Sequence, residues 1–229
     1  MRTIAVLAVA ALALAACGSD DDSTGDDVAT TDGSGTTGAA TAAGTDECPP
    51  EEGTAEQTRS FDSAPPNCLV DGAAYEAVVS TNKGEFTVAL DPGSAPEATN
   101  NFVFLARNQY FDDTVCHRII PDFVVQCGDP TATGTGGPGY TIVDEPPAPG
   151  QYQIGSLAMA KTAAPDSAGS QFFIVTGAQG TSLPPDYALF GQVTAGFDDT
   201  VVAMEAAGTP GAGTPTEPIE IQSIRIVQT

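Results

Sequence analysis

The sequence predicts a mainly β fold, in which eight antiparallel strands close into a barrel that two helices plug. From residue 75 onward, short apolar segments are separated by Gly and Pro, and apolar residues alternate with others within them, which is typical of strands. Only two longer segments show the spacing of a helix. Many short strands combined with few helices favour a barrel.

The first two strands are expected to form a hairpin around a turn at 82–84. The alternating apolar residues are Tyr75, Ala77 and Val79 before the turn, and Phe86, Val88 and Leu90 after it. Two such segments joined by a tight turn are typical of a hairpin. The other six strands are expected at 115–120, 123–127, 157–161, 171–176, 188–194 and 219–227.

The last of these strands has an irregular pattern. Ile219 and Ile221 share one phase of the alternation, whereas Ile224 and Ile226 share the other. We therefore expect a bulge near residues 222–223, or burial of the strand on both faces.

The first helix is expected to begin at Pro96. Proline suits a first helical turn, and Ala98, Phe102 and Leu105 then fall on one face. A short second helix is expected at 197–206.

The charge and composition exclude several classes of protein. The 229 residues include 30 acidic and 7 basic ones, which gives a formal net charge of −23. Nucleic-acid binding needs clustered Lys or Arg to contact phosphates, so no nucleic acid is expected as a partner. His117 is the only histidine, and the five cysteines form no Cys-x-x-Cys pair, so we expect neither a metal ion nor another cofactor.

The N-terminus has the features of an export signal. An apolar run over residues 4–16 is shorter than the roughly 20 residues that a membrane-spanning helix needs. It ends in Leu14-Ala15-Ala16-Cys17, which resembles the lipobox of bacterial lipoproteins and implies removal of a signal peptide, 1–16, and acylation of Cys17. Such an anchor would hold the protein on the extracytoplasmic side of the cell membrane. The alternative is an ordinary signal peptide before a chance cysteine.

The rest of the chain divides into three segments. Residues 17–60 are expected to be a lipidated cysteine and a disordered acidic tether, because Val28 is the one large apolar residue between 18 and 60. A plain spacer is the simpler interpretation of this tether, and a binding tail is the alternative. Residues 61–74 form a Pro-rich lead-in, and residues 75–229 form the barrel domain.

Two segments of the predicted barrel carry a distinctive motif. They are Cys116-His117-Arg118-Ile119-Ile120-Pro121-Asp122-Phe123-Val124-Val125-Gln126-Cys127-Gly128-Asp129 and Ala168-Gly169-Ser170-Gln171-Phe172-Phe173-Ile174. Together with segments 134–137, 157–160 and 189–191, they closely resemble the cyclophilin family of peptidyl-prolyl cis-trans isomerases. The resemblance implies a cyclophilin-like barrel, isomerase activity and a monomer.

The resemblance also assigns roles to individual residues. Arg118 is implied to be the catalytic residue, a charged donor that stabilises the twisted prolyl amide without covalent chemistry. The implied proline pocket consists of Phe123, Val124, Phe173 and Leu183, with Tyr187 as an aromatic wall. The implied peptide-holding groups are Gln126, Gln171 and the backbone of Ala160 and Lys161.

Three positions depart from the family pattern. Ser182 and Tyr187 stand where many cyclophilins have a tryptophan and a histidine, and Lys161 stands where an asparagine is common. Loss of an indole removes a large apolar surface and a hydrogen-bond donor. We expect this loss to affect cyclosporin binding more than catalysis.

The function expected from these features is that of an anchored isomerase that assists the folding of exported proteins. Its partners would be proline-containing peptides, unfolded exported proteins and, through the lipid anchor, the membrane. The alternative is a proline-peptide binding module with little or no turnover. A third interpretation, a hydrolase with His117 in a Ser-His-Asp triad, lacks the Gly-x-Ser-x-Gly motif.

Four cysteines remain after Cys17, and an exported protein can form disulfides. Cys48 and Cys68 are expected to pair, because both flank Pro-rich segments just ahead of the barrel. Such a bridge would fold the end of the extension back on itself.

For Cys116 and Cys127, the register of the predicted hairpin leaves two alternatives. If paired residue numbers sum to 243, the two cysteines lie opposite each other and a disulfide fits. If they sum to 244, Arg118 lies opposite Gln126, as a shared active site requires. A bulge near Gln126 would allow both.

Overall fold

The computed structural model describes residues 47–229. The predicted signal peptide, Cys17 and the predicted tether up to residue 46 lie outside the described residues. Within 47–229, no helix has both the length and the apolar character that a membrane span requires.

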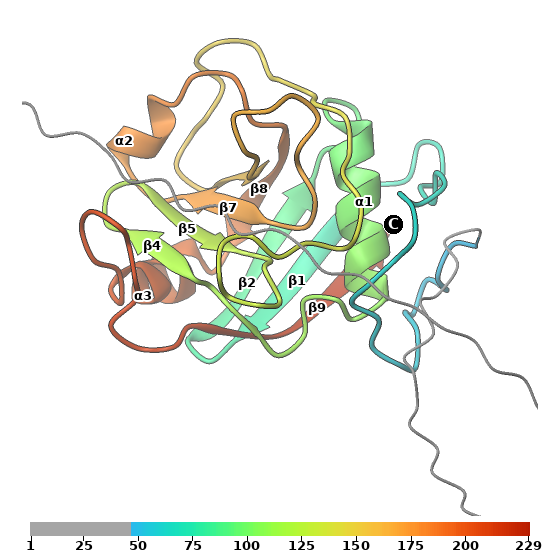
Figure 1. Ribbon diagram of the computed structural model, residues 1–229, viewed down its shortest axis with the longest axis horizontal. Coiled ribbons are helices and arrows are strands. Elements are labelled where there is room, and N and C mark those ends of the chain that lie inside the picture. The colour runs from blue at the N-terminus through green and yellow to red at the C-terminus, as the bar shows by residue number, and fades with distance from the viewer. Residues whose placement is uncertain (1–46) are drawn as a thin grey trace, which may run out of the picture. The chain divides into compact units, whose positions relative to one another are not determined.

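Nine strands form one antiparallel sheet in the order β3-β9-β1-β2-β8-β6-β7-β5-β4 (Figure 1). The strands are β1 (Tyr75–Thr81), β2 (Gly84–Leu90), β3 (Thr114–Val115), β4 (Arg118–Ile120), β5 (Val124–Cys127), β6 (Ser156–Met159), β7 (Phe172–Val175), β8 (Leu189–Ala195) and β9 (Glu220–Gln228). The mainly β, antiparallel fold class is thereby confirmed. The predicted closure of eight strands into a barrel is not confirmed.

The strand count differs because the segment 115–120 is divided. Val115 pairs with Glu220 of β9, whereas Arg118 pairs with Gln126 of β5. Only two residues separate β3 from β4, yet these strands are the two ends of the sheet. The short segment that joins β3 to β4 therefore runs from one edge of the curled sheet to the other. The two edge strands do not pair with each other.

The predicted hairpin is confirmed as β1 and β2. Thr81 pairs with Gly84, so Asn82 and Lys83 form a two-residue loop. Gly84 has a φ of +129°, a conformation that favours glycine. The Thr81 hydroxyl also fixes the loop, since it accepts a hydrogen bond from the Lys83 N–H.

The bulge predicted for the last strand is also confirmed. Ser80 pairs with Ser223 and Thr81 pairs with Ile221, which leaves Gln222 as the extra residue on β9. The extra residue reverses the phase of the alternation, so Ile221 and Ile224 are both buried.

The helix predicted from Pro96 is α1, Pro96–Arg107, which packs against β8 and β9. Its Phe102 ring lies 5.1–5.4 Å from three other core rings, those of Phe111, Phe172 and Phe190. The predicted helix at 197–206 divides into a π-helical turn, η1 (Phe197–Val201), and α3 (Val202–Glu205). A further short helix, α2 (Ala178–Thr181), was not predicted.

The tether prediction is wrong for residues 47–60, which pack against the domain. The backbone N–H of Thr54 donates to the Arg107 carbonyl, and that of Thr58 donates to the Asn108 carbonyl. The carbonyls at the end of a helix lack partners within the helix, so a segment that supplies N–H groups is stabilised there. The next residue along, Phe61, is 3% exposed and belongs to the main core.

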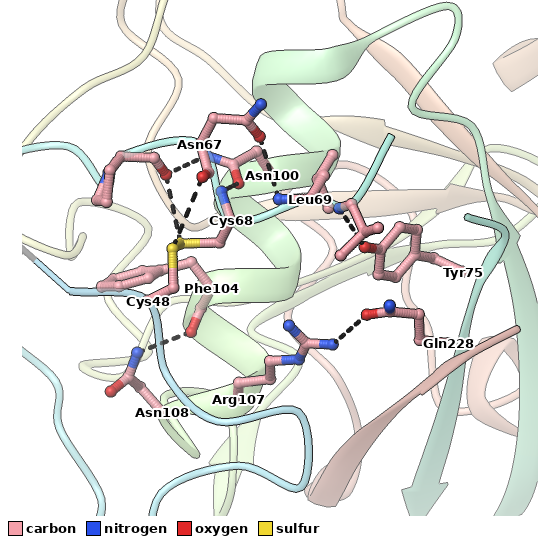
Figure 2. The surroundings of a disulfide bond; sticks show 12 residues. Cys48, Asn67, Cys68, Leu69, Tyr75, Asn100, Phe104, Arg107, Asn108 and Gln228 are labelled. Atoms are coloured by element: carbon pink, nitrogen blue, oxygen red, sulfur yellow. Dashed lines mark hydrogen bonds between the residues drawn. A yellow bond between two sulfur atoms is a disulfide. The ribbon is translucent and has the colours of Figure 1, made fainter. Parts of the chain in front are cut away.

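A disulfide joins Cys48 to Cys68, with the Cα atoms 5.4 Å apart. Figure 2 shows how this bridge lies beside α1: Asn100 accepts a hydrogen bond from the Cys68 N–H and donates one to the Pro66 carbonyl. The extension that precedes β1 is therefore held to the domain at several points along its length.

Candidate active site

A small second apolar cluster lies apart from the main core. Its buried members are Val124, Tyr152, Ala158, Phe173 and Val175, and the half-buried Phe123, Ala160, Leu183, Tyr187 and Leu189 pack against them. Six members of this cluster line a cavity of about 190 Å³: Phe123, Val124, Ala160, Phe173, Leu183 and Tyr187. Sites for drug-sized ligands measure about 300–1,000 Å³, so this cavity suits a single side chain.

The cavity is lined by nine of the ten residues predicted for substrate and catalysis. They are Arg118, Phe123, Val124, Gln126, Ala160, Lys161, Phe173, Leu183 and Tyr187. The tenth, Gln171, lines a neighbouring cavity of about 320 Å³, which shares Gln126, Ala160 and Lys161 with the first. A larger depression of about 530 Å³ beside the start of α1 is lined by no Lys or Arg.

Three side chains, on β4, on β5 and at the residue just before β7, form a hydrogen-bonded row. Arg118 Nη1 donates to Gln126 Oε1 at 3.2 Å, and Gln126 Nε2 donates to Gln171 Oε1 at 3.0 Å. Gln171 Nε2 then donates to the Gly136 carbonyl at 3.0 Å. The register of β4 and β5 brings the first two together, because Arg118 lies directly opposite Gln126.

The Gly136 carbonyl determines the orientation of this row. A carbonyl oxygen only accepts hydrogen bonds, so the NH₂ group of Gln171 must face it. The Gln171 oxygen then faces the NH₂ of Gln126, and the Gln126 oxygen faces Arg118. The guanidinium is thus held by an amide oxygen rather than by a charged partner.

Arg118 keeps donors for a ligand. The Arg118 Cζ lies 5.5 Å from the centre of the Phe123 ring, so the guanidinium covers one face of the cavity wall. Within residues 47–229, the ion pairs are Lys83 with Glu217 and Lys161 with Asp144, and neither involves Arg118. An arginine with five N–H donors and no carboxylate partner at the rim of an apolar cavity can donate to a bound amide.

The aromatic wall depends on a residue that the sequence analysis missed. The Tyr187 ring meets the Phe173 ring edge-on, with the centroids 5.4 Å apart. The Tyr152 hydroxyl donates to the Tyr187 carbonyl at 2.7 Å and accepts from the Tyr187 N–H at 3.1 Å. Burial raises the pKa of Tyr152 to about 12, so the hydroxyl keeps the proton that it donates. An isolated tyrosine outside any predicted strand gave no signal of this role.

Ala160 and Lys161, whose backbone is predicted to hold the peptide, already make contacts within the chain. The Ala160 N–H already donates to the Gln171 carbonyl at 2.8 Å. The Lys161 ammonium pairs with Asp144, whose carboxylate also accepts the Asp166 N–H. The ammonium therefore ties together two loops that border the Gln171 cavity, a contribution that the sequence analysis did not assign to this side chain.

Cys116 and Cys127 are joined by a disulfide, with the Cα atoms 4.0 Å apart. Arg118 nevertheless pairs with Gln126, so the hairpin of β4 and β5 has the register in which paired residue numbers sum to 244. The hairpin thus combines this register with the disulfide. The irregularity is not near Gln126 as suggested but at His117, the extra residue between the bridge and β4. The disulfide therefore lies beside Arg118 and Gln126, which face the cavity from β4 and β5.

No catalytic triad surrounds His117. Its Nδ1 is buried and has no hydrogen-bond partner in residues 47–229. Burial lowers the pKa of His117. The Asp129 carboxylate, the nearby acid, accepts hydrogen bonds from Thr131 and from the Gly134 and Gly136 N–H groups instead.

Comparisons with known proteins agree on one family. The model of that family, described as cyclophilin type peptidyl-prolyl cis-trans isomerase/CLD, matches residues 77–226. The probable peptidyl-prolyl cis-trans isomerase A of Mycobacterium leprae is 37% identical over 176 residues, which cover 70% of this chain and 95% of the relative. A peptidyl-prolyl cis-trans isomerase-like 1 of Gibberella zeae is 39% identical over 155 residues, which cover 66% of this chain and 94% of the relative.

Solved structures show the same similarity. A crystal structure of a Cryptosporidium parvum cyclophilin type peptidyl-prolyl cis-trans isomerase is 32% identical, with a TM-score of 0.62, and the match covers 68% of this chain and 99% of that one. A second crystal structure of that protein, in the presence of the dipeptide Ala-Pro, matches with 32% identity and a TM-score of 0.61, covering 67% and 99% of the two chains.

Proposed function

Because this chain belongs to the cyclophilin-type peptidyl-prolyl cis-trans isomerase family, we propose that it assists the folding of exported proteins from a lipid anchor on the extracytoplasmic side of the membrane. One observation carries the choice of site: an apolar cavity of about 190 Å³ has at its rim a guanidinium that no carboxylate of residues 47–229 pairs with. The cavity would take the proline ring of a substrate, and the guanidinium would act on its amide.

The chemistry required is rotation about a single bond. The barrier to rotation of a prolyl amide is about 18–20 kcal/mol, and the uncatalysed process takes tens of seconds or more. When the amide twists, its nitrogen loses conjugation and becomes a better hydrogen-bond acceptor. Arg118 would donate to that nitrogen, and the interaction is stronger in the twisted state than in the planar one.

The surrounding residues hold the Arg118 guanidinium in position before a substrate binds. Gln126 and Gln171 fix the guanidinium from one side, and Phe123 covers it from another. A donor that needs no reorganisation during the reaction lowers the barrier more than a mobile one. Phe173 and Leu183 would hold the proline ring while the peptide bond before it rotates.

The related structure in the presence of Ala-Pro supports proline-containing peptides as ligands of this chain. The alternative of a binding module without turnover rests on Ser182 and Tyr187, which depart from the family pattern. Tyr187 is fixed at both its N–H and its carbonyl by Tyr152, so the wall of the cavity is closed despite the change. The positioned Arg118 donor favours turnover over binding alone.

Arg118→Ala should lower kcat/KM for a prolyl tetrapeptide by about 10²–10³, the scale for loss of one preorganised donor. The melting temperature should change little, because Arg118 is half-buried at the rim rather than in the core. The assay is protease-coupled or NMR-detected isomerisation with the purified chain.

Arg225→Ala is the matched control, since Arg225 is exposed on β9. It should keep full activity. An Arg118→Ala chain that isomerises the peptide as fast as the parent would refute the assigned mechanism, and a parent that binds the peptide without isomerising it would establish the binding module.

The anchor has its own test. Cys17→Ser should move the protein from the membrane fraction to the soluble fraction, and metabolic labelling with a fatty acid should be lost. A Cys17→Ser protein that still sediments with membranes would exclude the lipid anchor. Activity of the purified chain should not change, because the lipid would determine location rather than chemistry.

A further inference from the structure

The loop between Cys48 and Cys68 lies outside the part of the chain that matches the family, residues 77–226. It nevertheless touches the region of the candidate site. The Phe61 N–H donates to the Pro138 carbonyl at 2.8 Å, and the Phe61 ring meets the Tyr140 ring edge-on at 6.3 Å between centroids. The approach is close, because a Cβ added at Gly139 would lie 2.4 Å from the Phe61 carbonyl oxygen.

The segment that Phe61 supports, residues 134–140, provides the Gly136 carbonyl that orients Gln171. Four glycines, at 134, 136, 137 and 139, give residues 134–139 little side-chain packing of their own. It is held at one end by the Asp129 carboxylate, which accepts from the Gly134 and Gly136 N–H groups. At the other end it is held by Phe61 and by the Tyr140 hydroxyl, which donates to Asn101 Oδ1 at 2.8 Å.

Phe61 itself is firmly placed. Its ring packs edge-on against Phe104 of α1, with the centroids 5.0 Å apart, and its side chain is buried in the main core. The loop that carries it is closed by the disulfide, and Cys68 is bonded to α1 through Asn100, as Figure 2 shows. A shift of the loop is therefore resisted by both a covalent bond and core packing.

We propose that Phe61 is a positioning residue of the isomerase: it fixes the 134–140 segment, and through Gly136, Gln171 and Gln126 it fixes Arg118. The extension that precedes the family domain is then part of the enzyme and more than a connection to the N-terminus. The proposal rests on the proposed role of Arg118, and the two are separated by the experiments below.

The main test is Phe61→Ala in the full-length chain. The cavity that takes the proline ring does not include Phe61, so KM should stay within twofold. The guanidinium would lose its fixed orientation, so kcat should fall at least tenfold, since small misplacements of a catalytic group have large effects on rate. Phe61→Leu, which keeps most of the apolar volume, should recover most of kcat.

A spectroscopic measurement distinguishes positioning from general loss of stability. In ¹H–¹⁵N spectra, the side-chain amide signals of Gln171 and Gln126 should shift in Phe61→Ala, at a temperature well below its melting point. Leu69→Ala is the matched control, because Leu69 also packs from the extension against the main core. It should lower the melting temperature, leave kcat within twofold and leave both amide signals in place.

Three results would overturn the proposal: a folded Phe61→Ala chain with kcat within twofold of the parent, an equal loss of kcat in Leu69→Ala, or unchanged amide signals. If Phe61→Ala does not fold, Gly139→Ala replaces it, because the added Cβ would push the 134–140 segment away from Phe61 and should lower kcat. A folded Gly139→Ala chain with the parent's kcat would also overturn it. An inactive parent or a fully active Arg118→Ala chain would instead contradict the proposed function.

Discussion

Asp129 illustrates how a single buried side chain organises the region around the site. It has no exposed surface, and its carboxylate accepts hydrogen bonds from Thr131, Gly134 and Gly136. Burial by itself would raise its pKa, but these donors outweigh that effect and lower the pKa to about 2. The ionised carboxylate thus holds the glycine-rich segment whose carbonyl orients Gln171.

The pH dependence of unfolding should reveal this contribution. An ordinary Asp has a pKa of about 3.9, so the folded value is depressed, and the stabilisation is complete above about pH 4 and is lost as the pH falls towards 2. Asp129→Asn should lower the free energy of unfolding by about 2 kcal/mol at pH 7, and by progressively less between pH 4 and 2. Urea titrations at a series of pH values measure this.

Glu76→Gln is the control for that series, because Glu76 is exposed on β1. It should leave the unfolding free energy nearly unchanged at every pH. A difference between parent and Asp129→Asn that is equally large at pH 2 and pH 7 would contradict the assignment.

At the scale of elements, α1 depends on distant segments at both of its ends. The residue before it, Ala95, offers no side-chain cap. The Glu145 carboxylate instead accepts the Glu97 and Ala98 N–H groups at 3.0 and 2.8 Å. At the other end, residues 54–58 of the extension cover the last carbonyls. A helix that covers β8 and β9 is therefore completed only when two remote segments are in place.

Glu145→Ala should lower the free energy of unfolding by about 1 kcal/mol, the usual cost of losing an N-terminal cap. Glu97→Ala removes a carboxylate from the same helical turn without removing a cap, so its effect should be smaller. Denaturation in urea followed by circular dichroism compares the two. If both variants lose the same stability, Glu145 contributes only charge near the helix end.

At the scale of the whole molecule, two disulfides within residues 47–229 add covalent links to the hydrogen-bonded sheet. One closes the extension onto α1, and the other lies beside Arg118 and Gln126. The strands at the two ends of the sheet, β3 and β4, are consecutive along the chain, and Cys116 of the second bridge lies between them.

Replacing both Cys48 and Cys68 by Ser should lower the free energy of unfolding by about 3 kcal/mol, as for other loops of this length. The Cys116–Cys127 disulfide closes a shorter loop, with a sequence separation of 11 against 20. Replacing both of its cysteines by Ser should therefore lower the free energy of unfolding by less. Peptide mapping before and after reduction checks the pairing, and free thiols at both Cys48 and Cys68 would contradict it.

The sequence by itself determined the elements whose pattern is local. The hairpin of β1 and β2, the start of α1 at Pro96 and the bulge at Gln222 each follow from apolar periodicity and turn residues within a few positions. The residues of the cavity could be predicted for a different reason, because Arg118 and the surrounding motif resemble a known family.

Only the tertiary structure decided the features that join remote parts of the chain. Tyr152 reaches Tyr187, Glu145 caps α1, and Phe61 supports the segment that carries Gly136. Each of these residues either satisfies a polar group or fills a space in a remote part of the chain. Many other segments of similar composition could do the same, so no local sequence pattern identifies which residue does it. The division of 115–120 into β3 and β4 has the same origin, because which strands lie at the two edges is a property of the whole sheet.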